Sequence, residues 1–500
     1  MALRPTEQKR KRRGSDVHPP LQKDARPWGP EVAHEAGTTM ASCLFPLLLG
    51  IGCMVALVGE LRLPVWPAVL IALGLPILLF GRLLHGGQWP RRDLRWAWVP
   101  LVVAVTSYVD PSWTGPMLSD QSDHLQTANR YLGRWEWEPF HMDQDFSFRP
   151  KVISGLAAVE LAMTGTSTRV HLVPWLVLVA CGWQIQRLTE ESGAGRWSLL
   201  APLLVLPLPA MMQQGRTVYL EALATGGLIF ALRLSLKFLD EPANTRKGLL
   251  QGAALAAVGL AKFPYLYLGP ALAVAVGWRT RSMACAGRVV FGWAVVIAPF
   301  FLSDWVDHGQ FAASINPQMT GAVASLTGEV GTYGPGQAVG EMMVELSLVL
   351  HVLFAAGFVL WVMGDVPLRA TTVFGLLVPG LVLFAFVLDF GWPRYHLPWL
   401  AGLVCFGLAG LVNPPPAHDV FRHAAWRPVA MALLMVCSGM HLNAVFDEAI
   451  EEREGIEENV EWRWNLFEHY TALEPSIPED AVVLAGYDIS LGLRYGVQTY

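Results

Sequence analysis

The feature that most constrains this chain is a long series of apolar runs, each close to the length of a membrane-spanning helix. The hydrocarbon core of a bilayer is about 30 Å thick, which takes about 20 helical residues at a rise of 1.5 Å each. Runs that reach or approach this length occupy residues 41–60, 64–84, 96–109, 169–186, 197–213, 217–238, 249–264, 265–279, 289–303, 345–363, 370–388, 396–412 and 427–445. They predict an all-α polytopic membrane protein with about 11–13 transmembrane helices.

The composition agrees with a membrane protein. Hydrophobic residues make up 53% of the chain and charged residues only 15%, whereas a typical soluble domain has about 25% charged residues. The net charge of −5 is small, and no basic-aromatic pattern indicates a nucleic-acid partner. The six cysteines are scattered singly, so we expect small apolar side chains and neither disulfides nor metal ligands.

Charge between the runs predicts the orientation of the chain. Residues 1–38 carry five consecutive basic residues, Lys9 to Arg13, and are expected to form a disordered cytoplasmic tail. Arginine and lysine concentrate in alternate loops, which the positive-inside rule assigns to the cytoplasm. The transmembrane domain then covers 39–445, with extracytoplasmic loops at 110–151 and 304–344.

Two segments lie outside this alternation of spans and loops. Residues 152–164 are too short to span comfortably and contain Glu160, so we expect an interfacial or re-entrant helix. Residues 446–500 are expected to form a short extracytoplasmic α/β tail, in which "AVVLAGYDIS" has the pattern of a strand. The outer loops lack N-glycosylation signals, which favours a bacterial inner membrane as the location of the protein.

The first outer loop contains the densest group of ionisable residues, "SDQSDHLQTANRYLG" from Ser119 to Gly133. Helical spacing follows Asp123, so this aspartate is either a helix N-cap or a carboxylate held at the membrane surface. In the second case it is able to accept a proton from an acceptor hydroxyl. The residues alone leave both interpretations open.

The order of such motifs resembles the C-type-fold membrane glycosyltransferases, which use polyprenyl-phosphate sugars and include protein O-mannosyltransferases and aminoarabinose transferases. "DQSDHLQTA" is similar to their acidic motif, with Asp120 in the Asp position, Gln121 in place of Glu, and His124 in place of an aromatic residue. The resemblance implies that Asp120 or Asp123 is the catalytic carboxylate and that His124 lies beside the substrate.

Four later elements carry the same resemblance, which implies a substrate- or phosphate-binding role for their polar residues. These are Arg149 and Lys151 in "FRPKVISGL", Arg216 and Glu221 in "GRTVYLEALATGG", Lys262 in "GLAKFPYLYLGP", and Arg394 and Tyr395 in "GWPRYHLPW". Structural alternatives stay open for all of these residues except Arg394. The first two residues suit interfacial snorkelling, Glu221 suits an ion pair with Arg216, Lys262 suits a helix C-cap, and Tyr395 suits an interfacial aromatic.

The function that this resemblance implies is transfer of a sugar from a polyprenyl-phosphate donor to a glycan, lipid or protein acceptor in the cell envelope. No cofactor is demanded by the ligand spacing, although Asp120, Asp123 and His124 are able to supply ligands to Mg or Mn. Three alternatives remain. They are a transporter or flippase for lipid-linked glycans, a polysaccharide polymerase or ligase using the loop 304–344, and a non-catalytic membrane protein.

Overall fold

The computed structural model describes residues 30–85, 98–100, 120–134, 150–165, 170–214, 220–240, 244–309, 311–315, 340, 346–364, 396–412, 428–447 and 450. Every regular element within these ranges is a helix. The elements are α1 (Pro30–Glu60), α2 (Trp66–His85), α4 (Asp120–Tyr131), α5 (Val152–Thr164), α6 (Leu172–Thr189), η5 (Glu190–Ala194), η6 (Gly195–Leu199), α7 (Leu200–Val205), α8 (Pro209–Gln214), α9 (Glu221–Asp240), α10 (Thr245–Ala261), η7 (Phe263–Tyr267), α11 (Leu268–Thr280), α12 (Met283–His308), η8 (Ala313–Ile315), α15 (Leu348–Gly364) and α17 (Leu397–Val412).

Among the described residues, three helices are long and apolar enough to cross a membrane, namely Cys43–Glu60, Met283–Val306 and Pro428–Asp447. Shorter apolar helices include Leu348–Met363 and Leu397–Val412. These elements confirm the predicted all-α polytopic membrane fold, while the total number of spans stays a prediction. The run 370–388 and the tail segment with the expected strand lie outside the described residues.

Two expectations about helix boundaries are corrected. Helix α1 begins at Pro30, so the disorder expected for the basic tail up to residue 38 is wrong for residues 30–38. The predicted single span at 197–213 is broken into η6, α7 and α8. Proline accounts for the break between α7 and α8, because Pro209 starts a new helix where no earlier hydrogen bond is needed.

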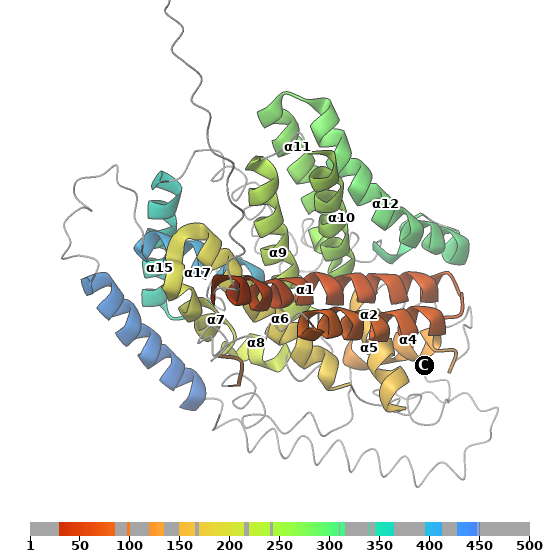
Figure 1. Cartoon of the computed structure of the whole chain (residues 1–500), viewed down its shortest axis with the longest axis horizontal. Coiled ribbons are helices and arrows are strands. Elements are labelled where there is room, and N and C mark those ends of the chain that lie inside the picture. Colours follow the sequence, from red (N-terminus) through yellow and green to blue (C-terminus); the bar gives the residue numbers. More distant parts are fainter. Residues whose placement is uncertain are drawn as a thin grey trace, which may run out of the picture.

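The helices pack as a bundle in which many neighbouring helices are not consecutive in the chain (Figure 1). Helices α1 and α2 lie side by side, and α5 crosses below them against α1. Helix α10 packs between α9 and α12, and α17 packs against α15, α9 and α6. The ends of several helices distant in sequence therefore meet.

Glycines allow the closest of these contacts. A Cβ atom on Gly52 would lie 2.6 Å from the carbonyl oxygen of Val152 in α5, and a Cβ on Gly155 would lie 2.9 Å from the backbone nitrogen of Ala56. The backbones of α1 and α5 therefore touch, which is how small residues bring membrane helices together.

Apolar side chains on other helices face away from the protein. Only 33% of the α12 span and 22% of the span Pro428–Asp447 are buried inside the protein. Large exposed side chains on α12 include Phe291 and Val306. Such apolar surface suits contact with lipid, as expected for an integral membrane protein.

Candidate functional site

Helix α4 begins at Asp120, so the helix predicted to follow the acidic motif is confirmed. Both Asp120 and Asp123 lie in its first turn, where free backbone N–H groups and the helix dipole favour negative charge. The helix begins three residues before Asp123, so the N-cap role expected for that residue is wrong, while the role of either aspartate as a catalytic base stays a prediction.

His124 connects α4 to α5. Its side chain is 1% exposed, and its Nδ1 atom lies 3.1 Å from the Oγ atom of Ser154. This contact fixes the first turns of α4 against α5, immediately after the two aspartates. The substrate contact that the resemblance implied for His124 stays a prediction.

Lys151 lies at the N-cap position of α5. Its ammonium group lies beside Glu60, which the sequence did not indicate as a site residue. The Nζ atom of Lys151 lies 3.4 Å from Oε1 of Glu60, with both side chains about 5–6% exposed. The hydroxyl group of Tyr131 donates a hydrogen bond of 2.5 Å to the same oxygen. Residues from α1, α4 and α5 thus converge on one carboxylate.

A second cation, Arg130, is close enough to this carboxylate to interact with it electrostatically. Burial lowers the pKa of Arg130, and the negative charge of Glu60 acts in the opposite direction. Burial, together with the charge and hydrogen bond of Glu60, raises the pKa of Tyr131 well above its usual value. Tyr131 therefore stays a neutral hydrogen-bond donor, and Arg130 stays a cation, since no protein environment readily deprotonates a guanidinium group.

The end of α12 closes the same cluster. The hydroxyl group of Ser303 donates a hydrogen bond of 3.0 Å to the backbone oxygen of Glu60, and α12 also packs against α1. We refer to Glu60, Arg130, Tyr131 and Lys151 as the α1-end cluster.

Glu221 and Lys262 form a second buried pair. The Nζ atom of Lys262 lies 3.1 Å from Oε1 of Glu221, and each side chain is 5% exposed. The backbone of Lys262 is the C-cap of α10, as one alternative expected, and its N–H group donates to the oxygen of Val258. Its ammonium group reaches the first residue of α9. Arg216, the partner that the sequence suggested for Glu221, lies outside the described residues.

Aromatic residues extend this pair toward α17. Tyr265 of η7 interacts electrostatically with Glu221, and its ring centroid lies 6.2 Å from that of Trp399 in α17. His396 directly precedes α17 and is fully buried. The start of α17 therefore lies beside the Glu221–Lys262 pair, close in sequence to Arg394 and Tyr395.

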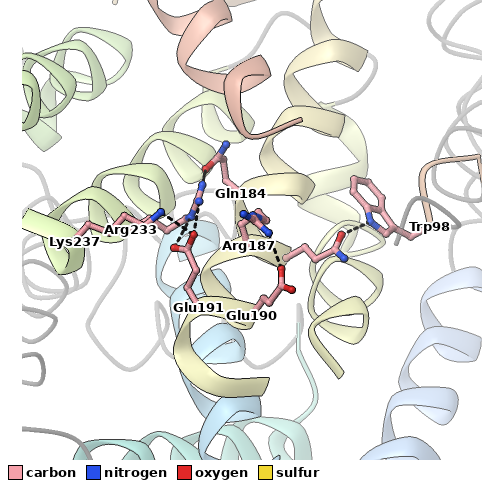
Figure 2. Close-up of polar contacts among 8 residues, drawn as sticks. Trp98, Gln184, Arg187, Glu190, Glu191, Arg233 and Lys237 are labelled. Carbon is pink, nitrogen blue, oxygen red and sulfur yellow. Dashed lines mark hydrogen bonds and ion pairs between the residues drawn. The ribbon is translucent and has the colours of Figure 1, made fainter. Parts of the chain in front are cut away.

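A third polar network lies at the other ends of α6 and α9 (Figure 2). Arg233 donates to both carboxylate oxygens of Glu191, at 3.1 and 2.7 Å, and also to Gln184. The ammonium group of Lys237 is 3.0 Å from Glu191. Burial alone would raise the pKa of Glu191, but Arg233 and Lys237 hold it below its usual value. About 18 Å of helix separates Arg233 from Glu221 along α9, so this network is distant from the other pair.

Glu160, the acidic residue within the apolar segment 152–164, caps the N-terminus of α6. Its carboxylate accepts hydrogen bonds from the backbone N–H groups of His171, Leu172 and Val173, at 2.6 to 2.8 Å. These groups begin α6 and have no partner within the helix. Helix α5 is buried from Val152 to Leu161 and packs against α1 and α4, so Glu160 joins it to the next helix.

The remaining expected site residues have the following status. Arg149, Arg216, Arg394 and Tyr395 lie outside the described residues, and Asp120 and Asp123 are described only through their backbone. No group of three or more His, Cys, Asp or Glu side chains able to hold a metal occurs within the described part of the chain. The expected use of Mg or Mn is therefore untested. All six cysteines are free.

The fold and these sites define an integral membrane protein that is helical in its described part and whose buried lysine–glutamate pairs lie at helix ends. No protein-family model matches the sequence, and no curated protein matches it either. The fold is similar to that of the crystal structure of ArnT from Cupriavidus metallidurans bound to undecaprenyl phosphate, with a TM-score of 0.50 and 13% identity. The similarity covers 81% of this chain and 85% of that chain. At this identity the comparison establishes the fold and not the activity.

Proposed function

We propose that this protein is a membrane glycosyltransferase that moves a sugar from a polyprenyl-phosphate donor to an acceptor hydroxyl. The observation that carries the proposal is the fold shared with ArnT, a protein whose crystal structure contains undecaprenyl phosphate. The α1-end cluster supports it, because Lys151 and Arg130 provide buried positive charge of the kind that binds phosphate oxygens.

In the proposed reaction, an aspartate at the start of α4 acts as general base. Asp120 or Asp123 takes the proton from the acceptor hydroxyl, whose oxygen attacks the anomeric carbon of the sugar. The bond between that carbon and the phosphate oxygen breaks, and the oxygen stays on phosphorus. A single displacement inverts the configuration of the anomeric carbon.

Basic residues stabilise the departing phosphate in this mechanism. Lys151 and Lys262 have the required charge, and Arg149 and Arg394 are proposed to add to it, because fixed positive groups favour the charge that develops in the transition state. Glu221 holds Lys262 through the pair described above. Mg or Mn would supplement this charge if the aspartates and His124 bind one.

The position of the buried charges distinguishes this proposal from a transporter. A transport path predicts ionisable residues near the middle of spans. Glu60 is the last residue of α1, Glu221 is the first residue of α9, and Lys262 directly follows α10. Charge at these helix ends supports chemistry at a membrane surface, whereas Arg233, farther along α9, is paired with Glu191.

The test is sugar transfer in proteoliposomes supplied with a panel of polyprenyl-phosphate sugars. Replacing the catalytic aspartate by asparagine, D120N or D123N, is expected to lower turnover by about 10²–10⁴-fold. Asp447, which accepts a hydrogen bond from Asn443 on an exposed helix end, gives a matched control, and D447N should retain full activity. Absence of transfer from every donor, or full activity in both aspartate variants, would contradict the proposal.

A further inference from the structure

The turn between α11 and α12 carries exposed basic and large apolar side chains at one end of the bundle (Figure 1). Arg279 and Arg281 are exposed, and Trp278 and Met283 beside them are 86% and 83% exposed. Neither arginine forms a hydrogen bond or an ion pair with another side chain in the part of the chain that the structure describes. Both guanidinium groups are therefore available to a ligand outside the described protein.

Arg246 adds a third exposed cation at the same end of the bundle. It lies in the first turn of α10. A Cβ atom on Gly248 would lie 3.2 Å from the Cβ atom of Arg288, so the start of α10 lies beside the second turn of α12. Two connections that are distant in the chain thus bring arginines to one end of the bundle.

Helix α12 places these arginines at the level of lipid headgroups. Met283 begins an apolar span of 24 residues, which is about 36 Å long and exceeds a hydrocarbon core of about 30 Å. Farther along the same two helices, Val274 and Phe291 are 72% and 63% exposed, as lipid-facing side chains are. Trp278 lies between this apolar surface and the arginines, which is the usual place of an interfacial tryptophan.

Two of the arginines occupy positions that do not favour arginine. Arg281 is the C-cap of α11 and has a left-handed φ of 50°, a conformation that glycine adopts readily and other residues adopt at a cost. Arg246 lies at the start of α10, where the helix dipole disfavours positive charge. Departures from local preference are expected at functional sites, so these side chains indicate a role beyond folding.

We propose that Arg246, Arg279 and Arg281 bind the phosphate group of an anionic phospholipid. Trp278 and Met283 then lie beside the upper part of its acyl chains. The planar guanidinium group matches phosphate oxygens in shape and charge. An excess of basic residues predicts that this end of the bundle is cytoplasmic, and the cytoplasmic leaflet is the one that carries negative surface potential.

This lipid site is distinct from the site of the proposed reaction. Lys262 directly follows the last residue of α10, whereas Arg246 is in its first turn. The 17 residues of α10 separate these two positions by about 25 Å. The phospholipid would therefore be a permanent neighbour of the bundle and not the polyprenyl donor.

Two phospholipids with identical acyl chains test the proposal, namely anionic phosphatidylglycerol and zwitterionic phosphatidylcholine. Native mass spectrometry of the full chain in neutral detergent would give an apparent dissociation constant for each lipid. We expect the wild type to bind phosphatidylglycerol more tightly than phosphatidylcholine. R281G and R279Q should each weaken phosphatidylglycerol binding about fivefold, the usual contribution of one basic residue at a membrane surface, and leave phosphatidylcholine binding unchanged.

Two controls separate lipid binding from folding and from general surface charge. Glycine suits the left-handed φ of residue 281, so R281G should unfold at the same temperature as the wild type or higher while it loses lipid affinity. Arg196 is an exposed cation that lies over the ring of Trp197 in η6, 5.6 Å from its centroid. R196Q should therefore keep the lipid preference of the wild type.

The proposal would be overturned by equal affinity of the wild type for the two lipids. An equal loss of affinity in R196Q and R281G would also overturn it, because the effect would then come from total surface charge. Displacement of phosphatidylglycerol by a similar concentration of free glycerol phosphate would show a site for a soluble phosphate in place of a membrane lipid. The experiment uses no sugar donor, so none of these results bears on the proposed function.

Discussion

Lys262 directly follows α10 and Glu221 begins α9, and their side chains meet at 3.1 Å with 5% of each exposed. The two residues are 41 positions apart in the chain. A buried charge costs free energy unless it is paired. Removing either residue alone would take the ion-pair partner from the other buried charge, so this contact holds the two helices together.

We predict that K262M and E221Q will each destabilise the protein by about 3–5 kcal/mol, because each leaves one buried charge without its partner. The double variant, which is neutral at both positions, should recover much of that loss. Thermal unfolding in detergent measures the three variants. Destabilisation of the double variant equal to the sum of the two single effects would show that the residues are not coupled.

Acidification should remove the contribution of Glu191. Its pKa in the folded protein lies below the reference value of 4.5 because of Arg233 and Lys237. Its stabilising effect is therefore complete above about pH 4.5 and is lost as the pH falls through the lower, folded-state pKa. We expect E191Q to lower the unfolding temperature at neutral pH and to approach the wild type in acid.

Glu190 provides the control for this pH series. It pairs with Arg187 at 2.9 Å, and both side chains are 22–23% exposed. Such partly solvated pairs contribute about 0–1 kcal/mol, so E190Q should have a smaller effect at neutral pH. An equal effect of the two variants would argue against the Arg233 network as the source of stability.

We expect any side chain at position 52 to disrupt the contact between α1 and α5. A Cβ atom there would lie 2.6 Å from the oxygen of Val152, so G52A is expected to cost about 1–3 kcal/mol. Gly50 is two residues away on the same helix and has no atom within 4 Å of a built Cβ. G50A should therefore be neutral or slightly stabilising. Equal unfolding temperatures for G52A and G50A would count against the close contact between α1 and α5.

Loss of the Glu160 carboxylate should loosen the start of α6. Three backbone N–H groups donate to it, and E160Q should cost about 0.5–2 kcal/mol, the usual range for a helix cap. Hydrogen exchange at residues 171–173 should become faster while exchange in α9 stays the same. Unchanged exchange at those three amides would contradict the capping role.

The sequence predicted most helices because a membrane imposes a length on every apolar run. Helix α5 has the predicted bounds of 152–164, and α4 begins at the aspartate where its motif begins. The break at 197–213 was missed because the apolar pattern continues across residues 199–212, while α7 ends at Val205 and a new helix begins at Pro209.

Partners of buried charges were much harder to predict. The sequence suggested Arg216 as the ion-pair partner of Glu221 because the two residues are close in the chain. In the structure Glu221 pairs with Lys262, which follows another helix. Glu60 was missed because an acid after an apolar run has the same pattern whether it enters water or a buried cluster. Only the packing of α4 and α5 against α1 decides between these cases.

Helix α9 is held at two levels, by Lys262 at its first residue and by Glu191 at Arg233 and Lys237, three turns and more along the helix. These ion pairs connect α9 to different neighbours at two positions along its axis. The helix can therefore neither slide along its axis nor rotate about it without breaking a buried ion pair. Any movement that admits the polyprenyl donor proposed above is therefore expected to take place around α9, with this helix as the fixed element of the bundle.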